Sequence, residues 1–313
     1  EAAPAEETVA TEAEEPATGG ELSFSLATDQ LILDPNLTTY NVDIIVHNNI
    51  YRQLYRVNED ASGLEPFAAE SYEVNDDATI WTFKLRDDIK FSDGTPITAE
   101  DVVYSIERAM VPEAYWAWIF EEAGLVPGKT TALDERTVQF ELSYTFVPFL
   151  SYISGFWASI FPKAALEEMG DEEFFKHPIC SGEWMVEEMV QADHLSIVPN
   201  PYAIGEAKLD RVVIPMIIDD NTRMLQLQTG QIDVGYTVPA SQIDAVEALP
   251  DISVIGYPFA YTAVIYDNQT KPPMDDANFR MALNYAIDRE ALIDAVLFGH
   301  ATFPTSCLPK GVI

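Results

Sequence analysis

The stretch from Trp81 to Met110 constrains the fold more than any other part of this 313-residue chain. Its first residues alternate apolar and polar side chains, which is the period of a half-buried β-strand. A Ser-Asp-Gly turn follows at 92–94, and Thr98 and Asp101 then have the spacing of a capping box. Apolar residues continue at helical spacing until Pro112. The sequence therefore predicts a strand, a turn and a capped amphipathic helix.

The rest of the chain mixes the two periodicities without an internal repeat. Strands are predicted at residues 22–26, 138–142 and 195–197, and a turn at 34–36. Helices are predicted at residues 41–54, 219–229 (ended by Gly230), 278–286 and 289–298, the last with Asp288 as its N-cap. Strands and helices do not alternate regularly. This pattern indicates a mixed α/β or α+β protein.

Composition limits the possible partners. The chain has 48% apolar residues and is longer than a usual single domain, so we expect at least two lobes. It carries 52 acidic and 17 basic residues, a formal net charge of −35. A field of this sign repels phosphate backbones, so nucleic-acid binding is not expected.

Residues 1–20 consist mainly of Ala, Glu, Thr and Pro, with no aromatic and no basic side chain. Such a segment cannot bury enough apolar surface to offset ordering, so we expect disorder. It is typical of the acidic linker that follows the lipidated Cys of a bacterial lipoprotein, and an arbitrary disordered terminus is the alternative. No apolar run reaches the roughly 18 residues of a membrane-spanning helix.

Motifs for catalysis and metal binding are missing from the sequence. There is no nucleophile elbow, P-loop, dinucleotide fingerprint, zincin motif or EF-hand loop. We therefore predict no cofactor, no metal site and no enzyme activity. Adjacent acids, which a glycosidase would need in a cleft, are interpreted as solvated surface, and the histidines as ordinary. Two unpaired thiols are favoured over a disulfide for the only cysteines, Cys180 and Cys307.

Aromatic residues outside the periodic segments are the candidate ligand contacts. They form two runs, Tyr115–Trp118 after a proline and Tyr257–Tyr261 in a probable connection. Aromatic rings in loops suit ligand clefts because each buries a large area with little loss of rotamer entropy. Packing between lobes is the alternative for each residue.

The run Trp81–Met110, WTFKLRDDIKFSDGTPITAEDVVYSIERAM, resembles the family 5 extracellular solute-binding proteins of ABC transporters, which bind oligopeptides, dipeptides or nickel. Further family motifs follow in the family's order at 33–35, 160–163, 177–182, 198–202, 227–233 and 268–288. The last is most similar to the oligopeptide-binding branch. Ser181-Gly-Glu-Trp184 departs from the family by lacking a proline, and Asn278-Phe-Arg280 replaces the common x-V-R.

The resemblance implies a mixed α/β, periplasmic-binding-protein-like type II fold of the multi-lobed cluster C. It implies a large lobe formed by residues 21–58 and 178–263, with a second lobe, 59–177, inserted between them. Residues 264–313 would begin a ligand-closing third lobe. Family members continue beyond this point, so we expect the chain to be C-terminally truncated and its third lobe incomplete.

The implied function is that of a substrate-binding component of an ABC importer that captures oligopeptides or dipeptides. The protein would be a monomer that meets the permease subunits in the periplasm or at the outer face of the cell membrane, held by a lipid anchor. A nickel-complex or oligosaccharide binder and a secreted glycoside-processing enzyme are the alternatives.

The ligand-binding candidates come from loops and from the start of the first long helix. They are Tyr40, Asn41, Asp43, Trp116, Trp184, Tyr257 and Tyr261. The resemblance places an acidic residue at Asp43 that would meet a ligand cation. N-capping of the following helix is the alternative role of Asp43.

Overall fold

The computed structural model describes residues 19–256 and 264–302. The chain divides into two compact units, Glu1–Tyr236 and Thr237–Ile313, and each unit is described by itself. Most of the acidic segment 1–20, for which disorder is predicted, lies outside the described residues, as do Tyr257 and Tyr261.

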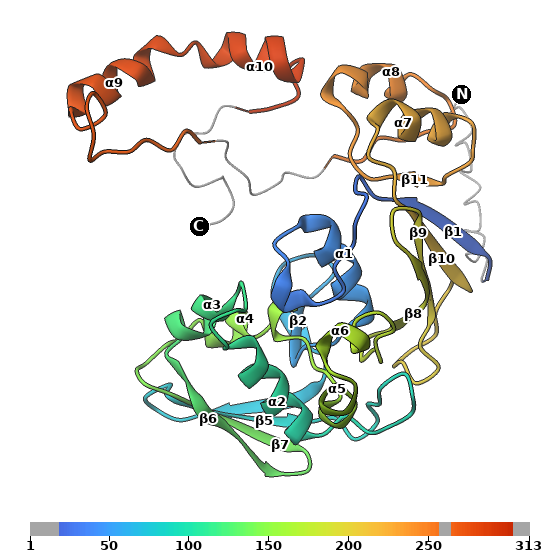
Figure 1. Cartoon of the computed structure of the whole chain (residues 1–313), viewed down its shortest axis with the longest axis vertical. Coiled ribbons are helices and arrows are strands. Elements are labelled where there is room, and N and C mark those ends of the chain that lie inside the picture. The colour runs from blue at the N-terminus through green and yellow to red at the C-terminus, as the bar shows by residue number, and fades with distance from the viewer. Residues whose placement is uncertain (1–18, 257–263, 303–313) are drawn as a thin grey trace, which may run out of the picture. The chain divides into compact units, whose positions relative to one another are not determined.

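A five-stranded sheet forms one half of the first unit, in the order β11-β1-β10-β9-β8 (Figure 1). The first strand of the chain, β1, pairs in parallel with both β10 and β11, whereas β10, β9 and β8 are antiparallel. The strands are β1 (Glu21–Ser25), β8 (Trp184–Val190), β9 (His194–Pro199), β10 (Arg211–Pro215) and β11 (Val234–Gly235).

Helices cover this sheet and bury a first hydrophobic core. They are α1 (Asn41–Ile50), α5 (Lys163–Met169) and α6 (Asp171–Phe174). Buried Leu195 and Ile214 of the sheet pack with Val46 and Tyr51 at α1 and with Phe161. Helix α7 (Asp220–Gln228) begins at the N-cap Asp219 and is followed by Gly230, which has a positive φ of 68°, as predicted.

A four-stranded antiparallel sheet forms the other half, in the order β4-β5-β7-β6. Its strands are β4 (Ala69–Val74), β5 (Ile80–Leu85), β6 (Leu125–Asp134) and β7 (Thr137–Leu142). Helix α2 (Ala99–Ala109) packs on β6 and β7, and its predicted stripe of Val102, Ile106, Ala109 and Met110 is buried in a second core. The predicted capping box is confirmed: Thr98 Oγ1 accepts the Asp101 N–H, and Asp101 Oδ2 accepts the Thr98 N–H at 2.9 Å.

Short elements lie between the longer helices and strands. They are the hairpin β2 (Tyr55–Val57) and β3 (Leu64–Pro66), the helices α3 (Ala117–Glu122) and α4 (Phe149–Tyr152), and the 3-10 turns η1 (Pro35–Leu37) and η2 (Phe156–Ala158). Each of the two cores packs against one of the two sheets, and both cores belong to the first unit. The predicted lobe boundaries near residues 58 and 177 stay predictions.

Three chain segments meet where the two cores adjoin. The backbone N–H of Ile160 donates to the carbonyl of Arg52 at 2.9 Å, and the N–H of Arg52 donates to Ser181 Oγ at 2.9 Å. Ser181 Oγ in turn donates to the Ile160 carbonyl at 2.7 Å. Next to it, a Cβ on Gly182 would lie only 2.5 Å from the carbonyl oxygen of Asn49, so only glycine fits there.

This junction corrects the predicted end of the first helix. A helix was expected over residues 41–54, but α1 ends at Ile50 and Tyr51 is extended, with φ −122° and ψ 153°. The N–H of Arg52 bonds to Ser181 instead of an intrahelical carbonyl. Periodicity alone cannot reveal a partner that lies far away in the sequence.

The second unit contains helices in its described part: η3 (Ala240–Gln242), α8 (Ile243–Glu247), α9 (Ala277–Ala286) and α10 (Arg289–Leu297). The two long predicted helices are confirmed within one residue, and Asp288 caps α10 by accepting the Ala291 N–H at 3.0 Å. Within residues 264–302, α9 and α10 have no buried residue; Leu292 and Val296 are 54% and 58% exposed.

Candidate ligand-binding site

The segment Asp34–Asn41 leads from β1 into α1. Buried residues hold it in place, and residues 39–41 form its exposed edge. Asp34, Asn36 and Thr38 are buried, whereas Tyr40 is 67% exposed and Asn41 is also exposed. Thr38 (φ −132°, ψ 152°) and Tyr40 (φ −84°, ψ 129°) both have extended backbone. The segment therefore offers an extended main chain and two exposed side chains outside either sheet.

The first end of this segment is fixed by Asp34. Its carboxylate accepts the N–H of Asn36 at 3.0 Å and binds the guanidinium of Arg108 on α2 at 2.5 Å. The hydroxyl of Tyr51 donates to the carbonyl of Leu33 at 3.0 Å. These contacts tie the turn η1 to both cores.

The second end is fixed by Asp43, whose side chain is 1% exposed. Its carboxylate accepts the hydroxyl of Thr38 at 2.5 Å and the N–H of Ile32 at 3.3 Å. Burial raises the pKa of Asp43 above its ordinary value, and the two hydrogen bonds oppose that rise. The carboxylate faces these two partners, and solvent does not reach it.

The N-cap role expected as the alternative for Asp43 is wrong. The N-cap of α1 is Tyr40, which makes no side-chain capping bond. Asp43 lies in the first turn of the helix, where the exposed N–H groups favour a negative charge.

Aromatic side chains lie against the same segment. The indole of Trp116 donates from Nε1 to the carbonyl of Thr38 at 2.8 Å. Its ring stacks on Trp157, with centroids 5.3 Å apart and planes at 29°, and meets Phe156 edge-on at 5.3 Å. The backbone N–H of Tyr115 donates to the Asn36 carbonyl at 2.9 Å, and the Tyr115 side chain is 59% exposed.

The structure thus brings Tyr40, Asn41 and Trp116 together but not every predicted residue. Trp184 begins β8 and packs, half buried, against the core of the five-stranded sheet. Sequence reasoning missed Thr38, Phe156 and Trp157. The pair Phe156-Trp157 was visible as adjacent aromatics after Gly155, but no pattern connected it to Trp116.

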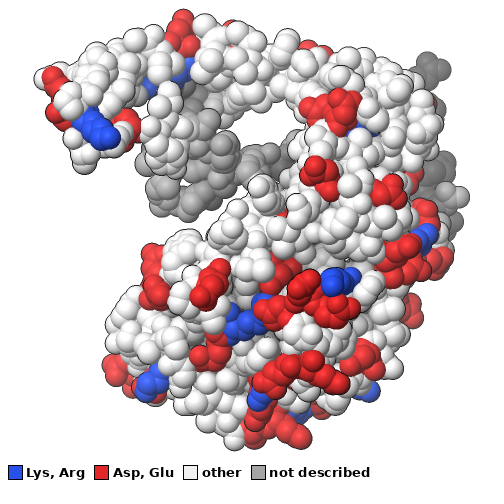
Figure 2. Space-filling view, viewed as in Figure 1, with Lys and Arg blue, Asp and Glu red and all other residues white. Residues whose placement is uncertain are grey.

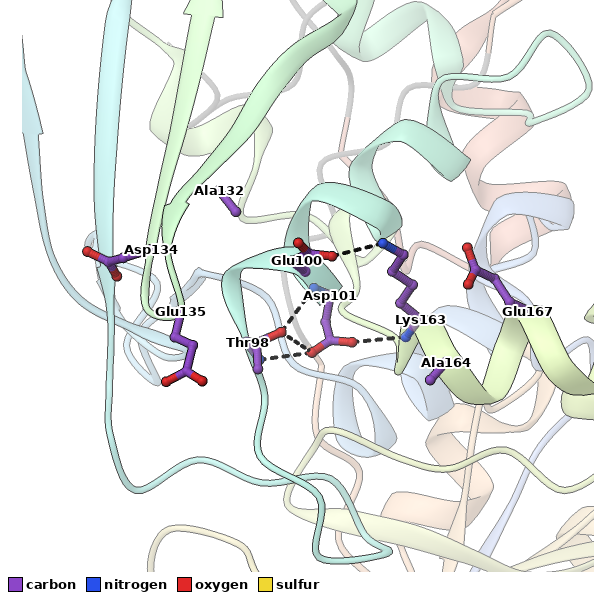
Figure 3. Close-up of a pocket in the computed structure, with 9 residues that line it drawn as sticks. All are labelled: Thr98, Glu100, Asp101, Ala132, Asp134, Glu135, Lys163, Ala164 and Glu167. Atoms are coloured by element: carbon purple, nitrogen blue, oxygen red, sulfur yellow. Dashed lines mark hydrogen bonds and ion pairs between the residues drawn. The ribbon is translucent and has the colours of Figure 1, made fainter.

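A hollow elsewhere in the first unit is lined mainly by charged residues, and its one cation, Lys163, already has a partner (Figure 3). Lys163 Nζ binds Glu100 at 2.9 Å, and the Lys163 N–H donates to Asp101 Oδ1 at 2.9 Å. Asp134 and Glu135 point away from Glu100 in the close-up. The hollow contains no predicted site residue and no converging carboxylate pair, so its contacts serve the starts of α2 and α5.

Three further observations concern metal binding, membrane-spanning helices and the cysteines. Over residues 19–256 and 264–302, no three His, Cys, Asp or Glu side chains are grouped to hold a metal ion. Within the same ranges, no helix combines the length and apolarity needed to cross a membrane. Cys180 is a free buried thiol, and burial raises its pKa to about 12. Cys307 lies outside the described residues.

Solved structures with the same architecture are solute-binding proteins. The first unit and its continuation match the periplasmic binding protein DppA of Helicobacter pylori in complex with the peptide STSA, with a TM-score of 0.83 and 25% identity over 94% of this chain. The murein tripeptide binding protein MppA of Escherichia coli gives a TM-score of 0.79 and 26% identity over 96% of the chain. The expected type II, mixed α/β fold is confirmed.

Sequence comparison identifies the family. Residues 63–313 match the bacterial extracellular solute-binding proteins, family 5 Middle. The chain is 32% identical over 300 residues to the probable D,D-dipeptide-binding periplasmic protein DdpA of Escherichia coli K12, and 30% identical over 294 residues to the glutathione-binding protein GsiB of Escherichia coli O1:K1. The chain belongs to the family 5 extracellular solute-binding proteins.

The matches cover most of this chain but little more than half of each relative. They include 93% of this chain but 57% of DdpA and of GsiB, and 61% of the DppA and MppA structures. The chain therefore spans less than two thirds of the length of these relatives.

Proposed function

We propose that this protein is the extracytoplasmic substrate-binding component of an ABC importer and that its ligand is a short peptide. Membership of family 5 supports the transport role. The names of relatives support the ligand class, since DdpA is called dipeptide-binding and the matching DppA structure contains a tetrapeptide. The observation that carries the proposal is the extended stretch from Thr38 to Tyr40 beside Trp116, in which Thr39 and Tyr40 are exposed.

An extended main chain next to aromatic rings suits a peptide for physical reasons. Among the described residues, the main-chain N–H and C=O of Thr39 make no hydrogen bond, so they can pair with a peptide backbone as in strand addition to a sheet edge. Such pairing is independent of the ligand's side chains and gives tolerance of sequence. The exposed rings of Tyr40 and Tyr115 then bury ligand side chains at low cost in rotamer entropy.

The proposal extends to location and partners. A periplasmic or outer-surface position and contact with permease subunits follow from the family's role, and the composition of residues 1–20 supports a flexible tether with a lipid anchor. The protein acts as a monomer in this proposal. Binding involves no chemical step, so the protein releases its ligand unchanged.

Calorimetry on the complete gene product tests the ligand class. We expect binding of Ser-Thr-Ser-Ala, D-alanyl-D-alanine or glutathione, and stabilisation by about 2.7 kcal/mol at 100 times the Kd. Tyr40→Ala should weaken binding severalfold without changing the melting temperature, because its side chain is exposed. Leu133→Ala, at a 55% exposed position on β6, is the control. Binding of oligosaccharides or nickel complexes with no response to peptides would show that the peptide assignment is wrong.

A further inference from the structure

One buried threonine joins three parts of the candidate site. The hydroxyl of Thr38, which is 1% exposed, donates to Asp43 Oδ2 at 2.5 Å, which links it to α1. The same oxygen accepts the N–H of Tyr40 at 3.1 Å, and the Thr38 carbonyl accepts the indole N–H of Trp116 at 2.8 Å. Asp43 also accepts the N–H of Ile32 at 3.3 Å, so it holds the chain on both sides of η1.

Apart from these bonds, the Tyr40 carbonyl accepts the N–H groups of Asp43 at 3.1 Å and Ile44 at 3.3 Å, where α1 begins. Within the described ranges, the main chain of Thr39 makes no hydrogen bond, and its side chain is exposed. A residue with so few contacts loses conformational freedom when a ligand orders it, and that loss weakens binding. The bonds around Thr38 hold its neighbours extended before any ligand arrives.

We propose that Thr38 and Asp43 are positioning residues of the ligand-binding site, which hold Thr39 and Tyr40 extended ahead of α1 in the ligand-free protein. This inference rests on the proposed function. Both side chains are enclosed, so neither touches the ligand; they act through Tyr40 and Asn41, which are exposed. Asp43, which was expected to meet a ligand cation, thus supports the site through buried hydrogen bonds.

The chain offers a matched control for this role. Thr98 Oγ1 donates to Asp101 Oδ2 at 2.6 Å and accepts the Asp101 N–H, at the start of α2. This second Thr–Asp pair begins a helix in the same unit but makes no contact with the segment 38–41. Thr98→Val should therefore reproduce the loss of a hydroxyl–carboxylate bond without the effect on the site.

Hydrogen exchange followed by mass spectrometry tests the positioning directly, without a ligand. In Thr38→Val, the amide of Tyr40 should exchange at least about tenfold faster, because it loses its acceptor, the Thr38 hydroxyl. Thr38→Ser keeps the hydroxyl and should exchange like the wild type, as should Thr98→Val in this segment. Asp43→Asn, which keeps the side-chain size, should give a smaller increase and serves as a second variant if Thr38→Val does not fold.

Calorimetry with Ser-Thr-Ser-Ala, D-alanyl-D-alanine and glutathione on the complete gene product then tests the consequence for binding. Thr38→Val should raise the Kd about tenfold or more, whereas Thr38→Ser and Thr98→Val should stay within twofold of the wild type. A melting curve for each variant separates this change from a loss of stability, which Thr98→Val should share.

The outcomes separate the two proposals. Unchanged exchange of the Tyr40 amide in both Thr38→Val and Asp43→Asn overturns the positioning role. Faster exchange with an unchanged Kd also overturns it, because the segment would then be held for folding alone. If the wild type binds none of the three probes, the proposed function fails, and the exchange comparison alone decides whether Thr38 and Asp43 position the segment.

Discussion

Arg108 and Asp34 form a two-pronged ion pair across 74 positions of the sequence, with Nη1–Oδ1 and Nη2–Oδ2 distances of 3.0 and 2.5 Å. The side chains are 11% and 3% exposed, and the guanidinium lies 4.9 Å from the ring centroid of Phe175. The pair joins α2 to the turn that leads into the candidate site. Because this ion pair is buried, breaking it should cost more stability than breaking an exposed pair.

Removing Arg108 should therefore destabilise the protein strongly. Arg108→Met leaves the carboxylate of Asp34 buried without its charge partner, and we expect a loss of about 3–5 kcal/mol in the free energy of unfolding. Urea titration monitored by circular dichroism measures it. Arg86→Met is the matched control, because Arg86 also binds an aspartate, Asp88, through two guanidinium N–H groups. Its side chain and that of Asp88 are 32% and 51% exposed, so its loss should cost less than about 1 kcal/mol. Equal losses in the two variants would contradict this account.

His47 should make the stability depend on pH. Burial lowers its pKa to about 4 from 6.5, although its hydrogen bond to the Ile32 carbonyl acts the other way. Between these values the unfolded chain binds a proton that the folded protein does not, so stability falls as the pH falls through this window. The loss approaches about 1.4 kcal/mol per pH unit, and about 3 kcal/mol in total.

The His47 contribution is measured as a difference, because the many carboxylates also titrate. The free energy of unfolding of the wild type minus that of His47→Gln should decrease steadily from pH 7 to pH 4.5. His177→Gln, at an exposed position, gives the matched control. A difference that stays constant with pH would show that the imidazole is not held neutral by burial.

Salt should stabilise the protein. Acidic residues outnumber basic ones by 52 to 17, and Figure 2 shows Asp and Glu spread across the visible face with few Lys and Arg between them. Raising NaCl from 0.01 to 0.3 M shortens the screening length from about 30 Å to less than about 10 Å and weakens this repulsion. The melting temperature should rise by roughly 2–4 °C for each 1 kcal/mol gained. Sucrose at equal osmolality is the control, and equal shifts in the two solutes would exclude charge screening as the cause.

Cys180 should resist thiol reagents until the first unit unfolds. Its side chain is fully buried, and with a pKa of about 12 only about one thiol in 10,000 would be ionised at pH 8. In a Cys307→Ser variant, which leaves Cys180 as the single thiol, reaction with Ellman's reagent should follow the unfolding rate across a urea series. Rapid labelling in native buffer would mean that the Cys180 side chain is accessible.

Local features of the fold were predictable and distant ones were not. Thr98 and Asp101 stand three positions apart, so the capping box and the helix after it could be read from the sequence and were confirmed. The bond between Trp116 and Thr38 spans 78 positions, and nothing in either segment indicates the other. A helical pattern likewise cannot show whether a first-turn acid is covered, and the expectation that Asp43 would meet a ligand cation did not include its burial.

The place of β1 in its sheet delays the pairing of this strand while the chain is being made. This strand precedes β10 and β11 in the chain by about 190 positions or more, yet it lies between them, and its contact with Arg211 spans 190 positions. At 5–20 residues per second, β1 waits roughly ten to forty seconds before its neighbours exist. The strands of the other sheet follow one another within residues 69–142 and need no such delay. A strand made long before its partners therefore pairs late, after the strands of the other sheet.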